Sequence, residues 1–108
     1  MSVPAPLKVF LVDGEQPARE RMREVLGDLA VELPNIVVGE AANGQEALAA
    51  LPALAPDVVL VDIHMPQMNG MEFARHLAIL ETPPAVVFVT AHDQYAIEAF
   101  EVNAIDYL

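Results

Sequence analysis

The chain of 108 residues contains no cysteine, which excludes disulfide bonds, thiolate catalysis and cysteine-ligated zinc. It also contains no apolar run near the roughly 18 residues that a membrane-spanning helix needs. The apolar run near the N-terminus is short and ends at Asp13, so it does not have the pattern of a secretory signal. These absences predict a cytoplasmic protein without a membrane partner.

Basic residues are scarce: 5 Lys and Arg stand against 16 Asp and Glu, for a formal net charge of −11. A chain this acidic repels phosphate backbones, so the domain itself is not expected to bind nucleic acid. Its acidity suits divalent cations or basic partner surfaces. Solubility alone explains the bulk charge equally well.

The length fits one domain, which we place over residues 1–108. Apolar residues make up 55% of the chain, enough for a core without disulfide staples. Short apolar runs rich in β-branched residues predict strands, most of them buried on both faces as in a parallel sheet. These runs are residues 9–12, 36–38, 58–61 and 86–89, with a fifth strand within 104–108.

Between the strands the hydrophobic period becomes helical. Pro17 begins a first helix whose apolar stripe is Ala18, Met22, Val25, Leu26 and Leu29. Asn43 and Glu46 form a capping box for a second helix, which Pro52 should end or distort. A third helix follows Gly70 with the stripe Phe73, Leu77 and Leu80, and a fourth covers 94–102. Strands alternating with helices predict an α/β fold, a doubly wound parallel five-stranded sheet whose final helix would lie beyond Leu108.

The three strongest strands each lead into a polar residue: Asp13, Asp62 and Thr90. Parallel strands bring these ends to one edge of the sheet, with Glu15 nearby, and ligands of open α/β sheets bind there. Two carboxylates repel each other unless a cation intervenes, and oxygen ligands suit Mg²⁺. A carboxylate beside that cation can attack phosphorus, and a hydroxyl can bond a phosphoryl oxygen. The plainer reading is that these residues only cap loops and helices.

The segment 61–70 reads Val-Asp-Ile-His-Met-Pro-Gln-Met-Asn-Gly and resembles the phosphoacceptor loop of bacterial response-regulator receiver domains. Within it, proline sets the turn, and Gly70 is expected to supply conformational freedom before the next helix. Segments 11–13, 43–48 and 56–57 match the same family in the right order, so the resemblance covers nearly the whole chain. It implies a flavodoxin-like sheet of order 2-1-3-4-5.

Residues 90–108 and 18–21 are similar to the LytR/AlgR class, whose receivers usually precede a LytTR-type DNA-binding domain. The resemblance therefore implies a transcription regulator, with residues 1–108 truncated before the last helix and before the DNA-binding domain. It implies a sensor histidine kinase as the partner. The domain would be no enzyme beyond catalysing its own phosphotransfer and dephosphorylation.

The resemblance also implies roles for individual residues. Asp62 would be the phosphoacceptor, and Asp13 would hold magnesium largely through water. Thr90 would be the switch hydroxyl, and Tyr107 the aromatic switch whose ring follows it. The backbone carbonyl of His64 would be a further metal ligand.

Two features depart from the family. Gly14 stands where a second acidic residue usually contacts the metal, so either Glu15 substitutes in part or magnesium binds weakly. The family's lysine, which pairs with the phosphoryl group, would fall two residues beyond Leu108. The open alternative is a phosphorylation-independent interaction or dimerisation module. An aspartyl-phosphate phosphatase is disfavoured, because its Asp-x-Asp loop would read Asp13-Gly14-Glu15 here.

The sequence also predicts where the three histidines lie and which surface mediates self-association. His64 and His92 would border the phosphoryl site as exposed loop residues, and His76 should face solvent. Ending the chain at Leu108 would uncover an apolar face near Ile105 and beside the first and fourth helices. We therefore expect a homodimer.

Overall fold

In the computed structural model, which describes residues 5–62, 65, 68–89 and 106–107, strands and helices alternate along the chain. The strands are β1 (Leu7–Val12), β2 (Asn35–Ala41), β3 (Val58–Asp62), β4 (Ala85–Val89) and β5 (Asp106–Tyr107). The helices are α1 (Gln16–Leu29), α2 (Gly44–Leu54) and α3 (Gly70–Ala78). The helix predicted over 94–102 lies outside the described residues.

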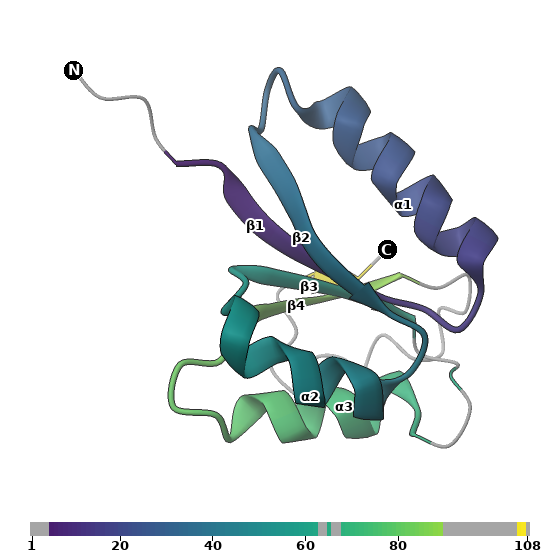
Figure 1. The fold of residues 1–108 in the computed structure, drawn as a ribbon, viewed down its shortest axis with the longest axis vertical. Coiled ribbons are helices and arrows are strands. Elements are labelled where there is room, and N and C mark those ends of the chain that lie inside the picture. Colours follow the sequence, from purple (N-terminus) through teal and green to yellow (C-terminus); the bar gives the residue numbers. More distant parts are fainter. Residues whose placement is uncertain (1–4, 63–64, 66–67, 90–105, 108) are drawn as a thin grey trace.

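The strands form one sheet of order β2-β1-β3-β4-β5, and every pairing is parallel. This confirms the predicted flavodoxin-like order. Figure 1 shows α1 on one face of the sheet and α2 with α3 on the other. The chain passes from β1 to β2 on one side and then crosses to β3 on the other, so the strand order switches between β1 and β3.

Side chains on the two faces of the sheet form separate apolar clusters. The larger cluster joins the sheet to α2 and α3 and includes the fully buried rings of Phe10, Phe73 and Phe88. The smaller one joins Val9 and Leu11 of β1 to Met22 and Leu26 of α1. Alternation along β1 thus sends Phe10 and Val12 to one face and Val9 and Leu11 to the other.

Among β1, β2, β3 and β4, only β1 has a run of residues that are buried on both faces of the sheet. Residues 9–12 of β1 are all buried, whereas β3 and β4 alternate between buried and half-buried positions. The predicted stripe of α1 is likewise buried only in part. Met22 and Leu26 pack on the sheet, but Val25 is 52% and Leu29 40% exposed. Among the described helices α1 alone covers this face of the five-stranded sheet, so no second described helix packs beside Val25 and Leu29.

The helix boundaries follow local side-chain chemistry. Asn43 accepts a bond from the Glu46 amide at 2.9 Å, as predicted, while the Glu46 carboxylate accepts from the Ala42 amide rather than from Asn43. Asn69 caps α3 in the same way by accepting from Glu72. Helix α2 continues past Pro52 to Leu54 and ends at Ala55 in the left-handed region, with φ of 44°.

Two details of the third helix differ from expectation. Gly70 is the first residue of α3, and no described glycine has a positive φ, so its conformational freedom is not used. Gly70 is instead buried. Leu80 lies beyond the helix and is 39% exposed, because α3 ends at Ala78. No helix in the described part of the chain is long and apolar enough to cross a membrane.

Candidate functional site

Asp13 and Asp62 lie at the carboxyl ends of the two strands between which the sheet order switches. Val12 pairs with Val61, so each aspartate directly follows one member of a pair on adjacent parallel strands. Neighbouring strands are about 4.8 Å apart, which brings the two backbones into one narrow region. Asp62 is the last residue of β3 and is half-buried, and Asp13 is only 6% exposed.

Alternation along β3 gives the side chain of Asp62 its direction. Val59 and Val61 belong to the larger cluster, and Leu60 packs against the smaller cluster beneath α1. Asp62 therefore lies on the same face of the sheet as Leu60. Helix α1 covers the same face, and it begins at Gln16, directly after the loop of residues 13–15.

Asp13 takes part in three hydrogen bonds with other described residues, and one of them involves its carboxylate. Its amide donates to the Ala41 carbonyl at 3.2 Å, and its Oδ1 accepts from the Glu15 amide at 2.9 Å. Its carbonyl accepts from a guanidinium nitrogen of Arg19 at 2.6 Å. Within residues 5–62, 65, 68–89 and 106–107, no hydrogen bond is recorded at Asp13 Oδ2.

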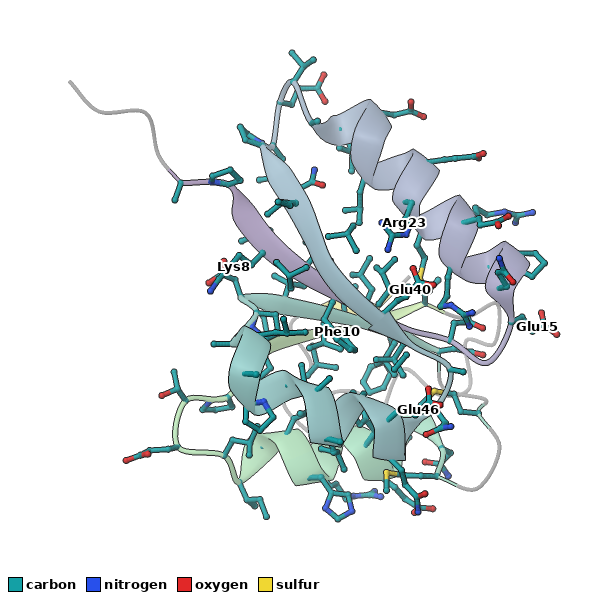
Figure 2. The ribbon with its side chains drawn as sticks, in the orientation of Figure 1. Lys8, Phe10, Glu15, Arg23, Glu40 and Glu46 are labelled. Carbon is teal, nitrogen blue, oxygen red and sulfur yellow. The ribbon has the colours of Figure 1, made fainter. Side chains whose placement is uncertain are left out.

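Glu15 and Gly14 occupy the loop between Asp13 and α1, and both are exposed. Glu15 takes the N-cap position of α1 without a side-chain cap, and Figure 2 shows it at the start of that helix. Over the described residues, no three acidic or histidine side chains gather closely enough to hold a metal ion. The predicted role of Glu15 as a further ligand stays a prediction.

The loop after Asp62 is anchored by two methionines. Met65 is buried in the larger cluster, and Met68 packs against the same cluster. Met68 also lies against Gly44 at the start of α2, where a Cβ would be 2.8 Å from its sulfur. Met65 and Met68 therefore attach this segment to the larger cluster.

Several predicted site residues lie outside the description. Thr90, His64 and His92 fall on residues that the structure does not describe. Tyr107 belongs to β5 and is described by its backbone alone, which pairs with Phe88 of β4. Val89, which precedes Thr90, pairs with Asp62. His76 is exposed on α3, as predicted.

An ion-pair network beside Asp13 was not predicted from the sequence. Arg19 and Arg23, one turn apart on α1, both bond the carboxylate of Glu40 on β2, with N–O distances of 2.6–2.9 Å. Figure 2 shows Arg23 and Glu40 pointing toward one another between helix and strand. The hydrogen bonds from Arg23, and then the single one from Arg19, lower the pKa of Glu40 below its ordinary value of 4.5. The i, i+4 spacing of the arginines was visible in the sequence, but their shared partner was not.

A groove of about 490 Å³ runs from this edge along α1. Its lining is mostly apolar, and its charged members are Asp13, Glu15 and Arg21. The lining residues are Asp13, Glu15, Pro17, Ala18, Arg21, Met22, Val25, Leu26, Leu29, Leu60 and Val89. The groove therefore joins the buried carboxylate of Asp13 to the exposed apolar side of α1.

Comparison with known proteins gives this arrangement a context. The profile of the family described as "Response regulator receiver domain" matches residues 9–108. The receiver domain of the putative response regulator NarL from Mycobacterium tuberculosis superposes with a TM-score of 0.85 at 34% identity, over 97% of this chain and 84% of that one. The response regulatory domain of protein mrkE from Klebsiella pneumoniae gives a TM-score of 0.84 at 28% identity, over 94% of this chain and 81% of that one.

Longer relatives are similar over almost the whole chain. The "Positive alginate biosynthesis regulatory protein" of Pseudomonas aeruginosa is 45% identical over 94% of this chain and 40% of its own length. The "Sensory transduction protein LytT" of Bacillus cereus is 43% identical over 94% and 40%. The "Transcriptional regulatory protein BtsR" of Salmonella typhi is 47% identical over 94% and 41%. The chain thus spans about 40% of the length of these relatives.

Proposed function

The chain belongs to the response regulator receiver domain family of two-component systems, and we propose that it accepts a phosphoryl group on Asp62 from a sensor histidine kinase. The observation that carries this proposal is the position of Asp62. It ends a central strand at the switch in strand order, beside the buried carboxylate of Asp13. Its loop has the residue pattern of the family's acceptor loop.

The proposed step is a displacement at phosphorus. A carboxylate oxygen of Asp62 attacks the phosphorus of a phosphohistidine, forming a P–O bond as the P–N bond breaks. The imidazole leaves with the electron pair of that bond and binds a proton from solvent. Little covalent chemistry is left for other side chains, so the domain contributes positioning and charge neutralisation.

Magnesium is the cofactor that this chemistry requires, and the donor set fits it. Asp13 offers a buried carboxylate whose Oδ1 is bonded and whose Oδ2 has no recorded bond to the described residues. Asp13, Asp62 and the carbonyl of His64 would hold the ion, with Glu15 as a further candidate. When bound, Mg²⁺ neutralises the charge of carboxylate and phosphoryl oxygens.

Output would pass through the remaining predicted residues. In the proposal, Thr90 bonds the phosphoryl group and the ring of Tyr107 follows it. Because the relatives are longer and two carry "regulatory" in their names, we extend the proposal to an attached LytTR-type DNA-binding domain. Phosphorylation would then switch transcription through that domain.

Acetyl phosphate with Mg²⁺ tests the acceptor directly. We expect one hydroxylamine-labile phosphoryl group on the chain and none on Asp62→Asn, detected by intact mass. Asp28→Asn removes an exposed carboxylate from α1 and should be labelled like the wild type. Labelling that survives in Asp62→Asn would overturn the assignment.

A second function is favoured by Gly14, which takes the place of an acidic residue, and by the absence of a three-carboxylate cluster among the described side chains. In this alternative the domain is an interaction module that works without phosphorylation. It predicts no label on the wild-type chain and an unchanged partner affinity in Asp62→Asn.

We further propose that a second copy of the chain covers the groove along α1. Val25 and Leu29 expose apolar surface there, and burying such surface is worth about 25 cal/mol per Å² before the costs of association. Val25→Glu should lower the dimer fraction in sedimentation equilibrium. Val31→Glu is the control, since Val31 is 91% exposed and does not line the groove. An equal effect of both changes, or a monomeric wild type, would refute the proposal.

A further inference from the structure

We propose that Arg19 is a positioning residue for the cation site, because it ties the loop that carries Asp13 to helix α1 and strand β2. The inference rests on the proposed function, in which Asp13 holds Mg²⁺. It concerns a different residue, one that touches neither the phosphoryl group nor the metal.

Arg19 makes two kinds of contact at once. One guanidinium nitrogen donates to the Asp13 carbonyl at 2.6 Å, and Nε donates to Glu40 Oε1 at 2.9 Å. The Arg19 side chain is 14% exposed, so water competes weakly for these bonds. A planar guanidinium holds both partners in a set geometry, which an ammonium group cannot do.

The backbone closes the same loop from the other side. The Glu15 amide donates to Asp13 Oδ1, and the Arg19 amide donates to the Glu15 carbonyl at 3.2 Å. Residues 13–19 are thus held by three bonds that all involve Asp13 or Glu15. If the Arg19 bond is removed, the Asp13 carbonyl loses its tie to α1, and the carboxylate loses part of its fixed orientation.

Arg23 provides the matched comparison on the same helix. It bonds Glu40 Oε2 through two nitrogens, at 2.9 and 2.6 Å, and its side chain is 47% exposed. No bond from Arg23 to Asp13 is recorded among the described residues. Arg23 therefore holds Glu40 alone, whereas Arg19 bonds both Glu40 and the Asp13 carbonyl of the loop.

The charge of Arg19 and its positioning role predict opposite changes in Mg²⁺ affinity when the arginine is removed. Each arginine carries a positive charge that repels a divalent cation, so removing either one should tighten Mg²⁺ binding if charge alone matters. Loss of positioning should weaken binding instead, since groups that orient metal ligands typically contribute about 10–100-fold in affinity. The direction of change at Arg19 separates the two explanations.

The test compares Arg19→Gln with Arg23→Gln in the unphosphorylated chain. Calorimetric titration with MgCl₂ should show about tenfold weaker binding for Arg19→Gln and wild-type or tighter binding for Arg23→Gln. Arg19→Lys should recover part of the affinity. Hydrogen exchange at the Glu15 amide, measured without metal, should become faster in Arg19→Gln than in Arg23→Gln.

Wild-type or tighter Mg²⁺ binding by Arg19→Gln would overturn the inference while leaving the proposed function intact. If the wild-type chain itself binds no Mg²⁺ and takes no phosphoryl group, the proposed function fails. In that case hydrogen exchange at the Glu15 amide is the remaining test of whether Arg19 positions the Asp13 loop. An exchange rate in Arg19→Gln equal to that of the wild type would refute the positioning role.

Discussion

Gly39 of β2 lies directly against the ring of Phe10 on β1. A Cβ at Gly39 would be 2.9 Å from Cε2 of that ring and 3.0 Å from Cδ1 of Leu54. The contact arises because the β1–β2 register shifts: Val9 pairs with Val37, but Phe10 pairs with Gly39. The bulge thus brings the residue without a side chain to the buried ring.

Gly39→Ala should therefore destabilise the domain by about 1–3 kcal/mol, because a Cβ overpacks a fully buried ring. Urea unfolding measures the difference. Gly27→Ala is the control: nothing lies within 4 Å of a Cβ at Gly27, and alanine in a helix gains about 0.5–1 kcal/mol. Equal stability of Gly39→Ala and the wild type would show that Phe10 shifts freely.

Ala55 ends α2 with φ of 44°, a left-handed conformation that costs a residue with a Cβ about 1–2 kcal/mol. Glycine adopts this conformation without that cost, although it loses more entropy on folding. We expect Ala55→Gly to raise the free energy of unfolding by about 0.5–1 kcal/mol, measured by urea titration. Ala53→Gly, inside the same helix, should lower it; an equal loss at both positions would contradict the prediction.

Glu40 gives the stability of the domain a specific acid dependence. Its arginine partners lower its pKa in the folded state. The contribution of Glu40 to the free energy of unfolding is therefore complete at pH values above 4.5, its ordinary pKa. It is lost as the pH falls through the lowered folded-state pKa. Glu40→Gln should thus be less stable than the wild type at neutral pH, and the difference should shrink in acid.

The expected difference at neutral pH is on the order of 1 kcal/mol, because Glu40 is 33% exposed and solvent screens the pair. Urea unfolding at several pH values checks it, and 1 M salt should reduce it. Glu24→Gln, an exposed change on the outer side of α1, is the control. A constant difference from neutral pH into acid would rule out the ion pairs as its cause.

Gly14 is the position where a carboxylate should strengthen the cation site. Its φ is not positive, so a side chain there meets no backbone strain. Gly14→Asp should tighten Mg²⁺ binding and lower the stability of the metal-free chain, since a third carboxylate joins Asp13 and Asp62. Calorimetry and metal-free unfolding measure the two effects.

Gly14→Asn tests whether charge is the cause. It adds an oxygen donor of the same shape without the negative charge, so it should tighten binding less and leave metal-free stability nearer the wild type. If both variants bind Mg²⁺ like the wild type, another group already occupies that position.

Local patterns predicted most of the fold. The β-branched runs at 9–12, 58–61 and 86–89 fall inside β1, β3 and β4, and the Asn43 cap lies where its spacing indicates. Such patterns depend on residues a few positions apart, so they can be read without knowing the tertiary contacts of the chain. The second cap, Asn69 with Glu72, has the same spacing but was not predicted from the sequence.

Burial on the α1 face was harder to predict. A helical stripe marks which side chains can face a sheet, but not how many a neighbouring helix will cover. Val25 and Leu29 belong to the stripe but are 52% and 40% exposed, because no second described helix packs beside α1 on this face.

For the site, the sequence by itself determined that two aspartates follow buried parallel strands, and parallel pairing then required them to meet at one edge. Only the tertiary structure decided what surrounds them. Arg19 meets Glu40, 21 residues away, because β2 pairs with β1 and passes beneath α1. A charged side chain has many partners of the right sign in an acidic chain, and only the packing of helix against strand selects one.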